Sequence, residues 1–429
     1  MSFRNNFFLG LMLVGFSCQG PNRQSGPAEV VSSWESNIAV PGPWQSHENV
    51  TTPNLFSDGT NLYLTWIKRD SVLSTLYYSR LGQNTWSDPQ RIAQGEDWFV
   101  NWADFPQFSA NKGTLMATFL KKSDSGTYTY DIYYTLSQTD KTWGLPQKLH
   151  RDSAKAEHGF VSIAPTKKGF VVSWLDGRNT LVSNNQSSGG SSAGHQGHAA
   201  GAMSIRSALV DFEGTLSPES LIDERVCDCC QTAIAVDERG YTLVAYRDRS
   251  AEEIRDISLK KGSPESGWSN PVSTKDHWGI AGCPVNGPSI DVFRNHLALA
   301  WFTAGQDKPR VQVAFSGTDT LQLTPGMRMD SGEAVGRVDV VQLSEDSAVV
   351  SWVEPQGLED YVRAQWVNDR GQKGPLRTVS QTESSRASGF PRLVRHGDRF
   401  YLATTRGVPG GASKITLTSW PLSDMLPSD

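Results

Sequence analysis

A short strand pattern returns along this chain at an almost constant interval, and it leaves few folds open. Each copy alternates apolar residues and closes on one marked position, which is aromatic in six of the seven copies. The seven positions are Trp66, Phe119, Trp174, Tyr246, Trp301, Trp352 and Thr404. The interval is 51 to 55 residues, apart from one of 72 that contains a Gly/Ser/His-rich insertion at 183–201. Such a fixed period is typical of a repeat architecture.

Each repeat carries signals for four short strands. A turn such as Asp58-Gly59 or Gly397-Asp398 separates the marked strand from the strand before it, and a third strand follows. A fourth contains an aromatic residue and a proline, as at 85–92, 142–149 and 267–274. Turns of this kind favour hairpins, and four antiparallel strands repeated around a centre form the blades of a β-propeller. We therefore predict an all-β protein with a single propeller of seven four-stranded antiparallel blades, six blades being the alternative.

The two ends of the chain complete one another in this pattern. The last repeat, 389–422, has only three strand signals, whereas segment 34–40, which begins at Trp34, resembles a fourth strand without a repeat of its own. Pairing that segment with the last repeat closes the ring and removes an exposed sheet edge. The predicted propeller domain therefore spans residues 33–424, and a short tail follows it at 425–429.

One turn between a third and a fourth strand carries a motif. The segment from Ser137 to Trp143 resembles the Asp-box, Ser-x-Asp-x-Gly-x-Thr-Trp, and the segment ending at Trp86 is a weaker copy. Together with the repeats, this makes residues 33–424 similar to the sialidase-like propeller superfamily, which carries the bacterial neuraminidase repeat. In such a box the Asp caps the hairpin backbone and the Trp packs between blades.

The resemblance implies a set of catalytic residues as well as a fold. Sialidases of this superfamily use an arginine triad for the substrate carboxylate, a Tyr/Glu nucleophile pair and an Asp acid/base. The position of the first arginine falls at 50–54, which contains none. The residues that come nearest to such a set are Arg337, Tyr361, Glu359 and Asp104. A fold does not fix a reaction, so hydrolysis is retained here as an alternative.

The N-terminal residues are predicted to direct export. Arg4 supplies a positive charge, and the apolar run at 7–16 is too short to cross a bilayer, as in a signal peptide. The run leads into Cys18 and there resembles the lipobox that bacterial lipoprotein signal peptidase cuts. We predict a signal peptide at 1–18, a lipid on Cys18 and a flexible tether at 19–32. An ordinary secretory signal is the alternative.

This prediction places the protein in a bacterial cell envelope, either in the periplasm or on the outer surface. The membrane is then a partner through the lipid anchor. The net charge of −5 and the pI near 5.9 provide no basic field, so nucleic acid is not an expected partner. A small acidic or glycan ligand and a protein partner both stay open.

The four cysteines of the predicted propeller fall in two loops. Cys227, Cys229 and Cys230 lie in the loop that leads into blade four, and Cys283 lies in the loop that leads into blade five. Such loops share one end of a propeller with the loops between second and third strands, and we call this end the loop face. The cysteines are therefore expected to cluster. They form either disulfides or a thiolate site for copper or zinc, with His158 as a further ligand.

Charged residues gather on the same face. Arg247, Arg249 and Arg255 alternate with acidic residues at 246–258, and Asn286 lies in the loop of blade five. The guanidinium groups either hold an anionic ligand or form a salt-bridge network that fixes the loop. We therefore predict an exported, membrane-anchored propeller that binds a ligand or a soft metal on its loop face through the cysteine-rich site. The alternative is an exo-acting glycoside hydrolase of sialidase type that acts on acidic glycans.

Overall fold

The computed structural model describes residues 38–82, 85–138, 142–181, 201–407 and 412–427. The chain divides into two compact units, Met1–Ser32 and Ser33–Asp429, and every described residue belongs to the second. The predicted signal peptide, the tether, Cys18 and Trp34 lie outside the described residues. Among the helices that are described, none is long and apolar enough to span a membrane.

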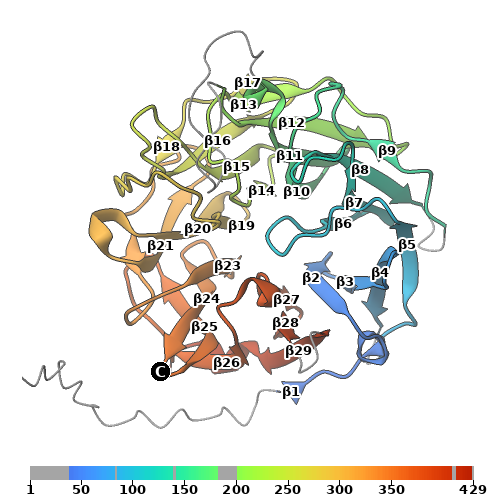
Figure 1. Ribbon diagram of the computed structural model, residues 1–429. Coiled ribbons are helices and arrows are strands. Elements are labelled where there is room, and N and C mark those ends of the chain that lie inside the picture. Colours follow the sequence, from blue (N-terminus) through green and yellow to red (C-terminus); the bar gives the residue numbers. More distant parts are fainter. Residues whose placement is uncertain (1–37, 83–84, 139–141, 182–200, 408–411, 428–429) are drawn as a thin grey trace, which may run out of the picture. The chain divides into compact units, whose positions relative to one another are not determined.

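The described part of the second unit forms seven antiparallel sheets that stand as blades around a central axis (Figure 1). Six of these sheets have four strands, and in blade four a fifth strand, β18, pairs with β16 beside β17. In blades one to six the strands pair in sequence order, with the first strand of each blade nearest the axis. The seven-bladed propeller is therefore confirmed.

The first four blades contain the following strands. Blade one has β2 (Val50–Ser57), β3 (Leu62–Arg69), β4 (Ser74–Leu81) and β5 (Gln90–Gly95). Blade two has β6 (Phe108–Asn111), β7 (Thr114–Lys122), β8 (Tyr130–Ser137) and β9 (Gln147–Lys148). Blade three has β10 (His158–Thr166), β11 (Gly169–Asp176), β12 (Ser204–Asp211) and β13 (Ser220–Asp223). Blade four has β14 (Ala233–Val236), β15 (Thr242–Arg247), β16 (Ile257–Ser263), β17 (Gly267–Trp268) and β18 (Val272–Ser273).

The last three blades and the short 3-10 helices complete the unit. Blade five has β19 (Ser289–Phe293), β20 (His296–Thr303), β21 (Arg310–Gly317) and β22 (Met327–Arg328). Blade six has β23 (Gly336–Gln342), β24 (Ser347–Gln356), β25 (Glu359–Asn368) and β26 (Arg377–Thr382). Blade seven has β27 (Arg392–His396), β28 (Arg399–Gly407), β29 (Ser413–Pro421) and β1 (Ile38–Ala39). The 3-10 helices are η1 (Pro43–Ser46), η2 (Arg178–Thr180), η3 (Gly305–Asp307), η4 (Arg386–Ser388) and η5 (Leu422–Met425).

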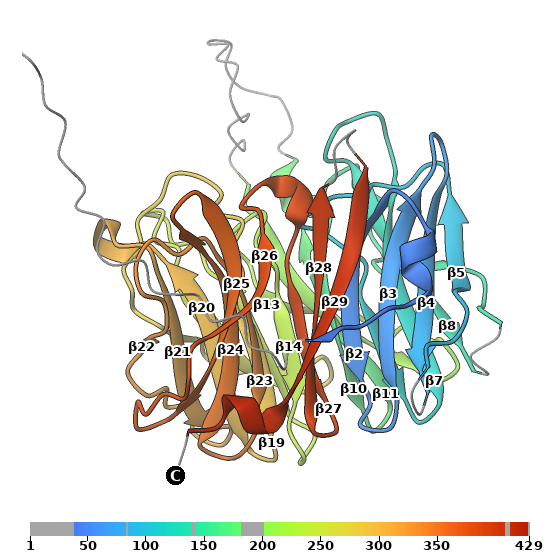
Figure 2. The same ribbon diagram turned by 90° about the horizontal axis from the view of Figure 1, so that it is seen from below.

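The ring closes where the N-terminal strand joins the last blade. Strand β1 lies along β29 in antiparallel register, with Ile38 opposite Ser419 (Figure 2). The amide of Val40 continues the ladder by donating to the carbonyl of Leu417 at 2.8 Å. The predicted closure is confirmed for these residues, and no outer edge of blade seven is left unpaired beside them.

The marked aromatic residues of the repeats lie between neighbouring blades. Trp66, Trp174 and Trp352 are fully buried. Trp174 of blade three packs with Tyr130 of blade two. Trp352 of blade six packs in the same way with Phe302 of blade five. Large rings contribute most to burial energetics, which explains why the chain repeats an aromatic residue at this position.

The Trp of each Asp-box-like turn also packs as predicted. Trp143 pairs with Ser137 across its turn, and its ring meets Tyr78 of blade one edge-on with 5.8 Å between ring centroids. Trp86 meets Trp44 edge-on at 5.1 Å. Residues 139–141, which include the Asp of the better box, lie outside the described residues.

Candidate functional site

Apolar side chains gather in the central channel toward the loop face. Phe105, Phe160 and Phe390 come from three different blades and belong to one buried cluster, with Cys229 packed against it. Gln231 connects the loops that lead into blades four and two, because its Nε2 donates to the carbonyl of Ala103 at 2.7 Å. The three rings and Gln231 line the channel at this end.

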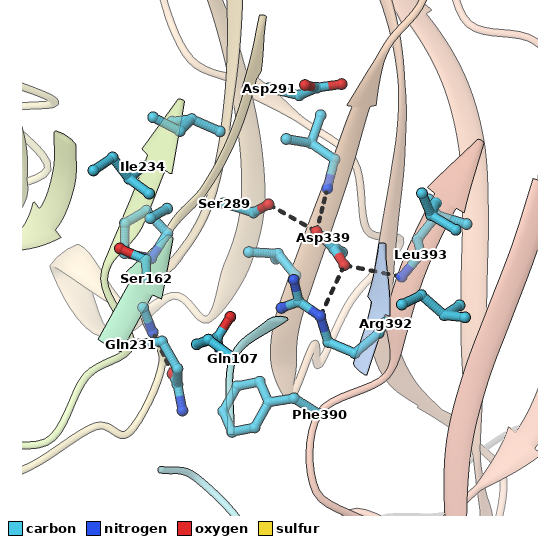
Figure 3. A pocket seen from close by; sticks show the side chains of 18 of the residues that line it. Gln107, Ser162, Gln231, Ile234, Ser289, Asp291, Asp339, Phe390, Arg392 and Leu393 are labelled. Atoms are coloured by element: carbon cyan, nitrogen blue, oxygen red, sulfur yellow. Dashed lines mark hydrogen bonds and ion pairs between the residues drawn. The ribbon is translucent and has the colours of Figure 1, made fainter. Parts of the chain in front are cut away.

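The channel itself contains a polar cavity of about 460 Å³. Its side chains come from the first strand of several blades, as Figure 3 shows. Asp339 is held on one wall, where it accepts hydrogen bonds from the Ser289 hydroxyl at 2.8 Å and the Leu393 amide at 2.9 Å. The guanidinium of Arg392 lies beside it, with Nε 3.6 Å from a carboxylate oxygen.

The cysteines converge on the loop face as predicted. Cys229 and Cys283 form a disulfide, with 6.2 Å between their Cα atoms, and so connect the loops that lead into blades four and five. A bridge over 54 residues stabilises the fold by about 4 kcal/mol in the chain-entropy account. In this state the two sulfurs are not available to a metal ion.

Cys227 and Cys230 lie beside that bridge as a buried pair of thiols. Their Sγ atoms are 2.7 Å apart, and both residues are at most 2% exposed. Burial opposes ionisation of Cys227, but the Cys230 thiol, the Cys229 amide and two arginine cations lower its pKa to about 7. Burial and the charge of Cys227 raise the pKa of Cys230. The pair therefore offers one thiolate near neutral pH, the form that binds metals and attacks disulfides.

Arg247, one of the two arginines that lower the pKa of Cys227, donates four hydrogen bonds, all to backbone oxygens. Its guanidinium donates to the carbonyls of Asn286, Arg255 and Phe302 at 2.6 to 2.9 Å. The ring of Trp278 covers it at 4.8 Å. Asn286 is equally engaged. Its Oδ1 accepts a hydrogen bond from the backbone amide of Arg337, and its Nδ2 donates to the carbonyl of Val335 in the loop before β23.

Arg249 and Arg255 belong to a salt-bridge network. Both donate to Glu253 at 2.7 Å, and Arg249 also pairs with Asp228 at 3.2 Å. Arg255 approaches the Sγ of Cys227 at 3.5 Å. The structure thus brings the predicted ligand-binding arginines to the cysteine cluster, where Arg249 and Arg255 pair with two carboxylates of the chain and Arg247 is held by carbonyls.

Asp104 lies at the border of the channel and shares a proton site with two other residues. It is 2% exposed and accepts hydrogen bonds from the Tyr130 hydroxyl at 2.9 Å and the Phe160 amide at 2.8 Å. Burial raises its pKa to about 7. The same hydroxyl lies 2.7 Å from Glu157, whose pKa burial raises to about 8. One hydroxyl cannot donate to two carboxylates, so one of the acids holds a proton near neutral pH.

This Tyr130 is an unsuitable nucleophile in the observed conformation. Its side chain is fully buried, and the ring of Phe99 is stacked on it at 4.1 Å. Sequence reasoning did not select Tyr130 or Glu157, because nothing in the local sequence indicates that the two meet Asp104. The arrangement stores a proton inside the fold.

The remaining predicted catalytic residues fall into two separate groups. Arg337 lies in a β-bulge with a φ of 53°, and its guanidinium donates to the Ser388 hydroxyl and the Gly389 carbonyl, both at 2.8 Å. Burial lowers its pKa to about 10. Tyr361 instead donates to Glu359 at 3.1 Å, near the start of β25, where Glu359 is exposed. The described contacts do not join Arg337 to this pair or to Asp104.

His158 lies in a cluster of its own rather than beside the cysteines. It stacks on His150 with 3.7 Å between nearly parallel rings, and both side chains are fully buried. Asp131, Asp152 and Asp176 surround them. The lone pair of an imidazole nitrogen lies in the plane of its ring. Two parallel, stacked rings therefore cannot both direct a lone pair at one shared ion. Arg178, 2.7 Å from Asp176, already supplies a cation there.

Comparisons with known proteins agree with the fold. No family model matches the chain, and no curated protein matches it. Among solved structures, a protein of unknown function from Dyadobacter fermentans is 14% identical, with a TM-score of 0.50 over 76% of this chain and 96% of that one. A polysaccharide lyase is 10% identical, with a TM-score of 0.50 over 93% of this chain and 94% of that one. A Hadza microbial sialidase is 13% identical, with a TM-score of 0.44 over 83% and 75% of the two chains.

The chain has a seven-bladed β-propeller fold, which it shares with the two neighbours at a TM-score of 0.50. The predicted resemblance is thereby confirmed at the level of the fold. At such low sequence identities the fold is all that the comparison shows to be shared. The reaction of a neighbour does not transfer with it.

Proposed function

We propose that this protein is an exported, lipid-anchored propeller that binds a soft metal ion, copper(I) or zinc(II), at the cysteine cluster of its loop face. The convergence of sulfur atoms carries the proposal. The Sγ atoms of Cys227, Cys229 and Cys230 lie within 4.8 Å of one another, and Cys283 is bonded to Cys229. An ion about 2.3 Å from each sulfur keeps the sulfurs no more than about 4.6 Å apart.

The surrounding charges suit a thiolate site. Three or four thiolates around a monovalent or divalent ion leave a net negative charge, and Arg247 and Arg255 lie close enough to offset it. Thiolates prefer copper(I) and zinc(II) over hard cations. Ion binding by all four sulfurs requires reduction of the Cys229–Cys283 bond, so the metal-bound and disulfide states compete.

Metal analysis of the mature protein, purified with and without reductant, tests the proposal. The reduced protein is expected to hold about one copper or zinc ion per chain and to release four thiols after unfolding in chelator. The Cys227→Ser/Cys230→Ser variant should lose the ion, whereas Arg294→Gln, at an exposed arginine, should keep it. Four thiols without bound metal in the reduced protein would overturn the metal site.

The lipid anchor is a separate part of the proposal. It is supported by Cys18 and the apolar run before it. The wild-type protein expressed in a bacterium should fractionate with membranes and carry acyl chains, and Cys18→Ala should do neither. Acylation of the Cys18→Ala protein would refute the anchor without affecting the metal site.

The alternative function is exo-acting hydrolysis of acidic glycans. One observation favours it, namely that Asp104 lines the cavity and has a pKa of about 7, as a general acid requires. Turnover of an aryl sialoside that is lost in Arg337→Ala or Tyr361→Phe would put the hydrolase first. No turnover across several pH values would remove it.

A further inference from the structure

We propose that the central channel is a second ligand site, independent of the cysteine cluster, and that it takes a small hydroxylated carboxylate whose acid group pairs with Arg392. The site is the cavity of about 460 Å³ described above. This volume lies within the usual range of small-molecule sites.

Arg392 carries the proposal because its hydrogen-bonding capacity is unused. A guanidinium has five donors, yet that of Arg392 makes no hydrogen bond to any described residue, and its buried Nε has only the ion pair with Asp339. Its contacts are the ion-pair distance of 3.6 Å to Asp339 and the ring of Phe105 at 5.7 Å. Buried donors are normally satisfied, so this one indicates a partner from outside the chain.

The two fully or nearly buried arginines near the axis, Arg247 and Arg337, differ from half-buried Arg392. Arg247 makes four hydrogen bonds to carbonyl oxygens, and Arg337 donates to carbonyls and to a hydroxyl. Burial alone therefore does not leave an arginine unpaired in this fold. Asp339 does not need Arg392 either, because Ser289 and two backbone amides already stabilise its carboxylate.

The other polar groups of the cavity suit hydroxyls. In Figure 3 the guanidinium of Arg392 points from β27 into the cavity, where Gln107, Ser162 and Ser289 also lie. Amide and hydroxyl side chains both donate and accept, as polyol recognition requires. Phe390 adds an apolar wall. A carboxylate on Arg392 with hydroxyls on its neighbours uses all of these groups.

Asp291 makes the proposed site sensitive to pH. It lies in the same cavity, and burial raises its pKa to about 6. The charged or titratable groups around it are Asp339 of the adjacent blade and, along the cavity, Asp104, Arg392 and Arg395. Protonation of Asp291 removes a negative charge, so an anion should bind more tightly at pH 5 than at pH 8.

The end of the cavity opposite the loop face offers an entry for the ligand. The aromatic cluster lies toward the loop face, whereas the opposite end is lined by half-buried Phe56 of β2 and by exposed Gly59 in the turn after this strand. A ligand that enters there does not pass the cysteines, so failure of the metal site and failure of this site can be told apart.

Calorimetric titration of the mature protein with D-gluconate tests the proposal, with D-sorbitol as the matched ligand that lacks the acid. Gluconate is expected to bind about tenfold more tightly than sorbitol, and Arg392→Gln should remove that difference. Arg294→Gln should retain it, and a thermal melt of each variant checks folding. Equal binding of the two ligands, or unchanged gluconate binding in folded Arg392→Gln, would overturn the proposal.

A second arm of the same titration uses Asp291→Asn. Wild-type affinity for gluconate should fall as the pH rises from 5 to 8, and the variant should show a weaker dependence, because Asp104 in the same cavity still titrates in this range. An Asp291→Asn protein that keeps the full pH dependence would contradict the assigned cavity. The titrations are run on metal-free, disulfide-intact protein, so that the cysteine site plays no part.

Discussion

The loop face and the channel of this propeller use arginine in opposite ways. At the loop face, Arg247, Arg249 and Arg255 are held by carbonyls and carboxylates of the chain itself. In the channel, Arg392 is half-buried beside Asp339 and makes no hydrogen bond to a described residue. The first arrangement fixes two loops around the cysteines. The second leaves hydrogen-bonding capacity for a ligand, because the fold does not depend on it.

The largest expected effect on stability comes from replacing Arg247, whose guanidinium donates four hydrogen bonds to backbone carbonyls. Arg247→Met leaves the carbonyls of Asn286, Arg255 and Phe302 without their donor in a site that water does not reach. We expect the free energy of unfolding to fall by about 3 to 5 kcal/mol. Urea denaturation measures it, with Arg294→Met as the exposed control, which should change stability by less than about 0.5 kcal/mol. A small loss for Arg247→Met would contradict a structural role for the network.

The disulfide at the same end gives the next effect. Replacing Cys229 and Cys283 together by alanine should lower the free energy of unfolding by about 3 to 4 kcal/mol, because the unfolded chain regains the freedom that the bridge removes. Reductant should destabilise the wild-type protein by a similar amount and leave the double variant unchanged. An equal response of both proteins to reductant would mean that this bond is not formed in solution.

A pH effect of intermediate size is expected from the proton held between Asp104 and Glu157. Their pKa values, about 7 and about 8, lie above those of an unfolded chain. This stabilisation is therefore complete below about pH 4 and is lost as the pH rises to 8. We expect a loss on the order of 2 kcal/mol over that range. Glu157→Gln should flatten the profile, whereas exposed Glu345→Gln should not, and identical slopes in all three proteins would refute the shared proton.

The sequence was sufficient for the fold because the fold is periodic. Every repeat reports the same strand order, so a weak signal at Trp86 or Thr404 is supported by its equivalents. The cysteine cluster was predictable for the same reason, since the period places 229 and 283 in adjacent loops. Both inferences depend on the spacing of residues along the chain and need no side-chain direction.

Side-chain direction is what the sequence does not reveal. Arg337 was predicted to belong to a catalytic set, but in the bulge before Asp339 its side chain binds Ser388 and Gly389 instead. A shift of one residue exchanges the two faces of a strand, and no local motif marks it here. His158 similarly stacks on His150, a partner contributed by the loop after blade two.

The smallest expected effect on stability is that of replacing Arg392. It decides whether the channel arginine differs from the loop-face arginines in being unnecessary for the fold. Arg392→Met removes a guanidinium that is 28% exposed and breaks no hydrogen bond to the described chain. Asp339 retains its three hydrogen-bond donors, and an ion pair at 3.6 Å with this exposure contributes little. We expect a loss below about 1 kcal/mol in urea denaturation, several-fold less than for Arg247→Met. A loss as large as that of Arg247→Met would mean that Arg392 supports the fold, and its guanidinium would then not be available to bind a ligand.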